Sequence, residues 1–231
     1  MELFPPRPKV VLTVNDGTLR IEGRVGCIHE NSHYPNVNVT NVTSIEFQDG
    51  IDRILCNAFA GFNTLESISI GGNVAVIEKH AFAGCNTLKS ISIDGDVGVI
   101  EKHAFESSQC RMFRVRGDVQ TIKGEAFMVC QYLEKVTVDK HVTRIETRAF
   151  YGGSLETFHA KHVSQLQTHA FTYCAKLTDF SVATIGHVML GGAFLHASTH
   201  IQVTPTDNTE RVMTGEVTPA PAIAKARPSN A

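Results

Sequence analysis

The sequence predicts an α/β solenoid, a stack of similar coils with one parallel β-sheet on its concave face and short helical or irregular turns on its convex side. Three observations predict it. The dipeptide Ala-Phe occurs seven times, with successive spacings of 23, 23, 22, 23, 21 and 23 residues. Apolar residues recur at fixed distances around each Ala-Phe. Each unit then closes with alternating apolar and polar residues, the pattern of a half-buried strand. Self-similarity at a nearly constant period is the signature of repeat architectures.

The repeat unit is clearest between Val74 and Ile93, which reads VAVIEKHAFAGCNTLKSISI. The spacing of 21 to 23 residues lies within the range of about 20–29 residues that defines leucine-rich repeats. About seven to eight such coils fit residues 37–203, and no proline occurs between Pro35 and Pro205 to remove a hydrogen-bond donor from the ladder. We therefore expect a leucine-rich-repeat array over residues 37–203.

The segments on either side of the array differ from it. Two alternating runs surround Asn15-Asp16-Gly17, which is a strong β-hairpin signal. Because a terminal coil needs a cap that shields the end of the core, we expect residues 1–36 to form an N-terminal cap built on this hairpin. After Val203 the chain contains four prolines and no periodicity, which predicts a disordered tail over residues 204–231.

Within each coil, the closing Leu-x-x-Ile-x-Ile piece is expected to form the strand. The Ala-Phe-x-x-Cys piece is expected to return along the convex side as a short helical turn, with Phe filling the interior of the coil. Cys85, Cys130 and Cys174 share the position three residues after Phe. Neighbouring cysteines of this column are two coils apart, whereas bridged Cα atoms lie within about 7 Å. We expect buried structural thiols rather than disulfides.

At these residues the sequence resembles the BspA-like (Treponema pallidum type) leucine-rich repeats, whose usual pattern is V-x-x-I-x-x-x-A-F-x-x-C-x-x-L-x-x-I-x-I. The resemblance covers about residues 37–203. It implies a right-handed β/α solenoid and a role in protein binding, and many family members are surface proteins or adhesins. The sequence departs from the pattern after the V-x-x-I isoleucine, where Glu78, Glu101, Lys123 and Glu146 replace the usual glycine.

Function is expected at the outward positions of the predicted strands, where side chains of successive coils form a column on the concave face. A sheet of this kind is a ready interaction surface. Three arginines form a basic cluster with Lys161 two coils further on, and this cluster is a candidate hot spot. The alternative is a solvated face with incidental charges. The candidate partner-binding residues are Glu46, Ser69, Ser92, Arg111, Arg114, Arg116, Thr137, His159, Lys161 and Ser181.

Two further patterns have simpler explanations. The triplet Arg116-Gly117-Asp118 spells an integrin-binding tripeptide, but Asp94-Gly95-Asp96 fills the same place one coil earlier. Gly-Asp is therefore expected to belong to the turn. Two N-glycosylation sequons begin at Asn38 and Asn41, and they matter only if the chain enters a secretory pathway.

Histidines share the position before Ala-Phe in three coils. Stacked imidazoles about 5 Å apart are spaced to share a metal ion. Arg148 occupies the same column and repels a cation, so surface histidines are expected instead. The histidines are His80, His103 and His169.

Composition and the lack of catalytic motifs narrow the function. With a formal net charge of −2, the chain has no overall basic field to hold nucleic acid or an anionic membrane. The N-terminus has no signal-peptide pattern, and no apolar stretch reaches the roughly 18 residues of a membrane span. There is no Gly-rich phosphate loop, H-E-x-x-H or G-x-S-x-G. We expect a monomeric, cytoplasmic protein-interaction module without cofactor or catalysis, the alternative being a surface-displayed or secreted adhesin or effector that binds a host protein.

Overall fold

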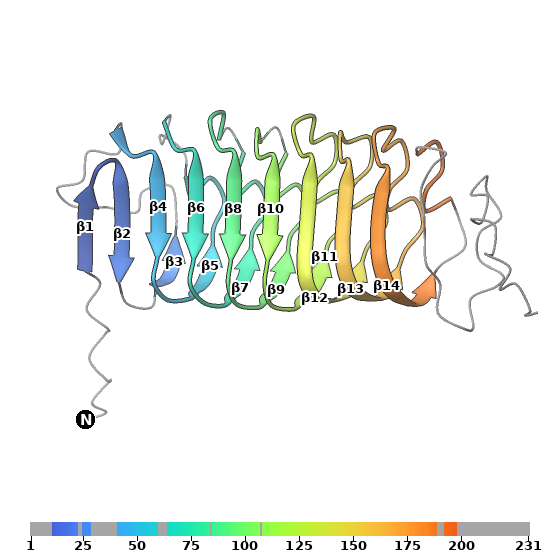
Figure 1. Cartoon of the computed structure of the whole chain (residues 1–231), viewed down its shortest axis with the longest axis horizontal. Coiled ribbons are helices and arrows are strands. Elements are labelled where there is room, and N and C mark those ends of the chain that lie inside the picture. The colour runs from blue at the N-terminus through green and yellow to red at the C-terminus, as the bar shows by residue number, and fades with distance from the viewer. Residues whose placement is uncertain are drawn as a thin grey trace, which may run out of the picture.

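The computed structural model describes residues 11–22, 25–28, 41–59, 64–83, 85–106, 108–188 and 192–197. These residues form a stack of coils made of strands that join into one 14-stranded sheet (Figure 1). In each coil the chain runs through a strand on one side, turns a corner and returns through a second strand on the other side. The predicted parallel-strand solenoid is therefore confirmed.

The first side of the stack holds the strands that the Leu-x-x-Ile-x-Ile pieces predict. Apart from the antiparallel pair β1–β2, each strand pairs in parallel with the strand one coil away. We call this row the first ladder and its outer surface the first face. Its short members are β1 (Val11–Asn15), β2 (Thr18–Glu22), β4 (Ser44–Phe47), β6 (Ser67–Ile70), β8 (Ser90–Ile93) and β10 (Met112–Val115).

A second ladder, on the opposite side, was not predicted. The expectation of one sheet face was wrong, because the V-x-x-I piece is also a strand. The buried apolar residues of each V-x-x-I strand are three positions apart rather than two, since both ends of these four-residue strands turn inward at corners. In β7, for example, Val74 and Ile77 are buried and Ala75 is exposed. The members are β3 (Val25–Ile28), β5 (Ile51–Ile54), β7 (Val74–Ile77), β9 (Val97–Ile100) and β11 (Val119–Ile122).

Three longer strands run through both ladders and join them into one sheet. They are β12 (Lys135–Ile145), β13 (Thr157–Leu166) and β14 (Asp179–Val188). The strand β12 pairs with β10 through its first half and with β11 through its second half. Two residues separate the parts of β13 that belong to the two ladders, against three in β12, and the pairing of β12 with β13 therefore shifts register between Val138 and His141.

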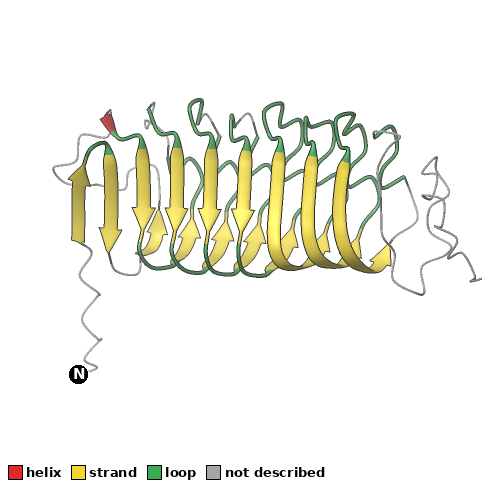
Figure 2. Cartoon of the chain, in the orientation of Figure 1, coloured by secondary structure: helices red, strands yellow, loops and turns green. Residues whose placement is uncertain are grey.

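The expected helical turns are absent from the described residues, which contain almost no helix (Figure 2). In each described coil the residue before Ala-Phe has a left-handed backbone, with φ between 54° and 62° from Asn57 to His169. In the last four coils a second left-handed residue follows the Phe by two positions, at Val129, Gly152, Tyr173 and His196. Only three residues lie between Arg148 and Gly152, fewer than the about 3.6 residues of one α-helical turn.

Instead of a helix, the Ala-Phe segments form a third hydrogen-bonded column. The Phe105 N–H donates to Ala126 O of the next coil at 3.1 Å, and Phe127 N–H donates to Ala149 O at 2.8 Å. Helices would make the turn side wider than the strand side. With hydrogen-bonded backbone all around, each coil advances by about 4.8 Å on every side. This geometry provides no cause for the expected concave face.

The predicted hairpin at the N-terminal end is confirmed. The strands β1 and β2 pair antiparallel with Asn15 opposite Thr18, which leaves Asp16 and Gly17 as a two-residue loop. Both loop residues have positive φ, 49° and 75°, as a type I′ turn requires. The strand β2 then pairs in parallel with β4 and so continues the first ladder. The expected cap boundary at residue 36 and the expected tail over 204–231 lie outside the described residues.

A continuous column of phenylalanines fills the interior, as the repeat predicted. Seven rings from Phe59 to Phe194 stack at centroid distances of 4.4 to 5.4 Å. Phenylalanines of the first ladder meet this column edge-on, as Phe158 does against Phe150 at 5.6 Å. Each alanine before a stacked Phe is also buried, because the backbone of the next coil passes beside it.

Close packing at the corners explains the glycines there. A Cβ atom on Gly117 would collide with Gly95 O and with the Asp96 carboxylate one coil earlier. We therefore expect Gly117→Ala to lower the free energy of unfolding by about 1–3 kcal/mol, the usual cost of overpacking. The matched control is Gly153→Ala, whose Cβ would lie 3.5 Å from Cys130 O, an ordinary contact. Equal denaturant midpoints for the two variants would contradict the corner packing.

Candidate functional site

The structure places the predicted outward positions in a single column on the first face. Each member is paired with the next directly across the ladder, from Glu46 on β4 to Ser181 on β14. All of them are exposed or half-buried. The column consists of Glu46, Ser69, Ser92, Arg114, Thr137, His159 and Ser181.

The other three candidate residues flank this column. Arg111 precedes β10, Arg116 follows β10, and Lys161 lies in the middle of β13 where that strand bends between the two faces. All three are exposed. The ten candidates therefore share the first face or its corner, which is the location that the repeat register predicted for them.

The predicted basic cluster is neutralised within the molecule. Arg111 pairs with Glu134 at 3.1 Å, Arg114 with Asp139 at 2.7 Å and Arg116 with Asp94 at 3.3 Å. The hydrogen bond from Arg114 to Asp139 raises the pKa of the arginine. Exposed pairs of this kind contribute little to stability, but they cancel the charge that a partner would meet. The geometry therefore favours the interpretation of these arginines as charges of a solvated face.

The integrin-type triplet is held in a corner. The Asp118 carboxylate accepts a hydrogen bond from His141 N–H at 3.0 Å and lies 3.0 Å from His141 Nδ1. Asp96 accepts the Asp118 N–H in the same way one coil earlier, at 2.8 Å. The expectation that Gly-Asp belongs to the turn is thus confirmed, since each aspartate links its corner to the corner of the next coil.

Two shallow hollows lie beside the bend of β12, β13 and β14. The larger, about 740 Å³, is on the side of the second ladder, and the smaller, about 410 Å³, is on the side of the first. Lys161 and Ala183 line both. His159 and Ser181, which were candidates from the sequence, line the smaller hollow together with Asp139. The structure thus brings three of the ten candidates, His159, Lys161 and Ser181, to one place.

The polar residues of the larger hollow were missed from the sequence. His162 is hydrogen-bonded to Thr184 through Nδ1 and to Ser164 through Nε2, the latter at 3.1 Å. His141 lies beside His162, with ring centroids 6.0 Å apart. These residues precede or lie within the second strand of their coils. The V-x-x-I pattern was the sequence signal for that strand, and interpreting it as a strand would have identified them as candidate surface residues.

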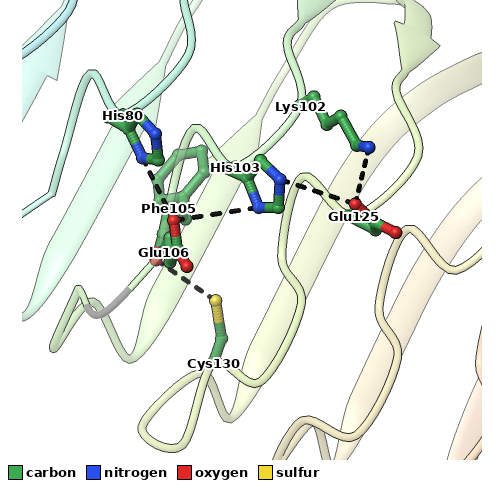
Figure 3. Close-up of polar contacts among 7 residues, drawn as sticks. All are labelled: His80, Lys102, His103, Phe105, Glu106, Glu125 and Cys130. Atoms are coloured by element: carbon green, nitrogen blue, oxygen red, sulfur yellow. Dashed lines mark hydrogen bonds and ion pairs between the residues drawn. The ribbon is translucent and has the colours of Figure 1, made fainter.

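Two histidines of the column before Ala-Phe lie in a network of imidazoles and carboxylates (Figure 3). The rings of His80 and His103 stack at 5.6 Å, as the coil spacing predicted. Glu106 Oε2 lies 3.2 Å from His80 Nδ1 and 3.8 Å from His103 Nδ1. On the other side of His103, Glu125 Oε2 lies 3.5 Å from Nε2.

Lys102 completes this network on its far side. Its ammonium donates to Glu125 at 2.8 Å, and this hydrogen bond is the largest cause of the lowered pKa of Glu125. His80 and His103 are half-buried by these contacts and not simply surface histidines. Among the residues that the structure describes, no group of His, Cys, Asp or Glu is placed to hold a metal ion. Within the same residues, no helix is long and apolar enough to cross a membrane.

Comparison with known families agrees with this architecture. A model described as the BspA type leucine-rich repeat region matches residues 28–155 and 99–211 with six copies. Together the two matches span most of the 231 residues and all strands from β4 onward. The chain belongs to the BspA-type leucine-rich repeat family. No curated protein and no solved structure matched the chain. BspA-type repeats form scaffolds for protein interaction, and proteins of this family are typically non-enzymatic.

The cysteine of the BspA-type repeat is a buried structural thiol in this chain, as predicted. Cys130 donates to Phe105 O of the preceding coil at 3.3 Å (Figure 3), and Cys174 donates to Phe150 O at 2.9 Å. Burial raises the pKa of both thiols to about 12, and it raises the pKa of Cys85 and Cys110 to the same value. Because the thiolate is the reactive form, these cysteines are unsuited to nucleophilic or redox chemistry.

Proposed function

We propose that this chain is a non-catalytic recognition protein that binds another protein on its first face. The observation that carries the proposal is the in-register column from Glu46 to Ser181. Its side chains differ from coil to coil while their backbone spacing stays constant at about 4.8 Å. A rigid array of this kind presents a fixed pattern of hydrogen-bond donors and acceptors, and repeat proteins use such extended surfaces for binding.

The chemistry of the column suits a polar protein surface. Serine and threonine hydroxyls both donate and accept hydrogen bonds, and the arginine and histidine add further donors. Ser67 and Ser44 form a second row beside the column and are linked by a hydrogen bond of 3.0 Å between their hydroxyls. These short side chains lose little conformational entropy when a partner docks, so the first face is preorganised for contact.

A matched pair of variants tests which face binds. Ser92→Glu/Thr137→Glu places carboxylates on both sides of Arg114 on the first face. Thr121→Glu/Gln165→Glu places carboxylates on both sides of Arg144 on the second face. Affinity capture from the source cells is expected to recover a partner with wild type and with the second-face variant, and to lose it with the first-face variant. Retention of that partner by the first-face variant would refute the proposal.

A further inference from the structure

The larger hollow is formed mainly by two columns of polar side chains on the side of the second ladder. The first column lies at the corner, directly before the second-ladder part of each coil, and the second column follows two residues later. Because neighbouring coils are about 4.8 Å apart, the corner column extends over roughly 19 Å. The corner column is Asp96, Asp118, His141, His162 and Thr184, and the inner column is Gln120, Thr143 and Ser164.

Several polar groups of this hollow have no partner in the part of the chain that the structure describes. Gln120 and Thr143 have exposed side chains that make no hydrogen bond within the described ranges. Asp96 accepts the Asp118 N–H through Oδ1 at 2.8 Å, and its Oδ2 has no hydrogen bond among the same residues. No described carboxylate oxygen lies within ion-pair distance of the Lys161 ammonium. A ligand in the hollow therefore meets unpaired donors and unpaired acceptors side by side.

The charges of the lining disfavour an ionic ligand of either sign. An anionic chain would lie against the carboxylates of Asp96 and Asp118, and a cationic chain would lie against Lys161. Both carboxylates also accept backbone N–H groups already, from Asp118 and from His141. Like charges placed together at an interface exclude the wrong partner, so the mixed lining favours an uncharged polar ligand.

The shape of the larger hollow suits a polar chain better than a protein side chain. Among the described residues that line it, Ala183 is the one with an apolar side chain, so the lining offers no apolar pocket for the aromatic or aliphatic anchor of a protein hot spot. In the register of the ladder the inner column continues as Gly98 and Gly186. Because these glycines carry no side chain, a ligand longer than the hollow can extend beyond it at either end.

We propose that the larger hollow binds a neutral oligosaccharide, an unbranched chain of uncharged sugar rings that lies across the coils from β9 to β14. A sugar hydroxyl donates and accepts hydrogen bonds through the same oxygen, so it fits a lining that mixes carboxylate, amide, hydroxyl and ammonium groups. Asp96 accepts a charge-assisted hydrogen bond from such a hydroxyl, and Lys161 donates one to it. The coil spacing of about 4.8 Å is close to the length of one sugar ring, so successive coils meet successive sugar units. This inference goes beyond the proposed function, because it concerns a different ligand on a different face.

The test applies the full chain to immobilised neutral oligosaccharides of glucose, mannose, galactose and N-acetylglucosamine, with heparin and polylysine as the charged comparisons. At least one neutral oligosaccharide is expected to bind more tightly than either charged polymer, and added salt is expected to leave its affinity unchanged. Gln120→Ala/Thr143→Ala removes two unpaired hydrogen-bonding groups and is expected to weaken binding by about tenfold. Ser69→Ala/Thr137→Ala, on the first face and outside both hollows, is the matched control and is expected to bind as wild type does.

Three results would overturn the inference: no binding of any neutral oligosaccharide, tighter binding of heparin or polylysine, or equal affinity for wild type and Gln120→Ala/Thr143→Ala. Denaturant unfolding of this variant checks that weaker binding is not caused by loss of the fold, and a midpoint equal to that of wild type is expected because neither side chain has a hydrogen bond among the described residues. The assay uses no protein partner, so its failure is separable from failure of the first-face capture.

Discussion

Replacing Phe127 with alanine is expected to lower the free energy of unfolding by about 3–5 kcal/mol, the usual range for removing a buried aromatic ring. Phe127 lies in the middle of the phenylalanine column, 4.4 Å from Phe105 and 4.9 Å from Phe150 between ring centroids. Phe113 of the first ladder packs against it at 5.7 Å. The cavity cannot close easily, because hydrogen bonds fix the distance between coils on each side.

Denaturant unfolding followed by circular dichroism measures this effect. Tyr132→Ala is the matched control, since this aromatic side chain is 45% exposed in the same coil and its loss is expected to change stability by only about 0.5 kcal/mol. A loss below about 1 kcal/mol for Phe127→Ala would contradict the claim that these rings fill the coils. A repeat array also unfolds in parts when one interface is weakened, so a broadened transition is expected in this variant.

Much of this fold could be predicted from the sequence, because the same pattern of residues recurs in every coil. The Ala-Phe spacing located the buried column, and the position after each closing leucine located the first ladder. The Asn15-Asp16-Gly17 signal located the hairpin, since only a type I′ turn uses two residues of positive φ in that way. Burial of Cys130 and Cys174 followed from their shared place in the coil. Each of these inferences depends on local spacing alone.

The two wrong predictions, a single sheet face and helical turns, concern the segments next to the corners of the coils. The V-x-x-I strands have apolar residues three apart, which does not match the alternation expected of a strand. The prediction of helical turns was wrong because the residue before each Ala-Phe has a left-handed backbone conformation. Residue types such as His80 and Glu125 do not indicate this conformation in the sequence. A non-glycine residue in this conformation is uncommon, so only the structure reveals that a whole column shares it.

The candidate site was partly predictable for the same reason. Register places Arg114 in a column with Ser92 and Thr137, but it does not show that Asp139 pairs with Arg114. That contact depends on how the side chains lie across neighbouring coils. Register alone therefore locates the charged residues of the first face but does not tell which of those charges are already paired within the molecule.

Raising the pH from 8 to 10 is expected to destabilise the protein strongly through its buried thiols. The pKa of Cys85, Cys110, Cys130 and Cys174 is raised by burial from 9.0 to about 12. Below pH 9 these thiols are protonated in both the folded and the unfolded chain. Above pH 9 only the unfolded chain releases the proton, so the stability that the protonated thiols contribute is progressively lost up to about pH 12. By pH 10 the loss is about 1.4 kcal/mol for each thiol, or about 5 to 6 kcal/mol for the four.

The experiment measures the free energy of unfolding at pH 8, 9 and 10 for wild type, Cys174→Ala and Cys56→Ala. Cys174→Ala is expected to be less stable at pH 8, because it leaves a cavity, but to lose about 1.4 kcal/mol less than wild type on going to pH 10. Cys56 is exposed, so Cys56→Ala is expected to follow the pH dependence of wild type. The difference between each variant and wild type isolates the contribution of the substituted cysteine. Parallel pH profiles for wild type and Cys174→Ala would show that this thiol releases its proton as readily in the folded chain as in the unfolded one. That result would contradict the claim that Cys174 is shielded from water inside the coils.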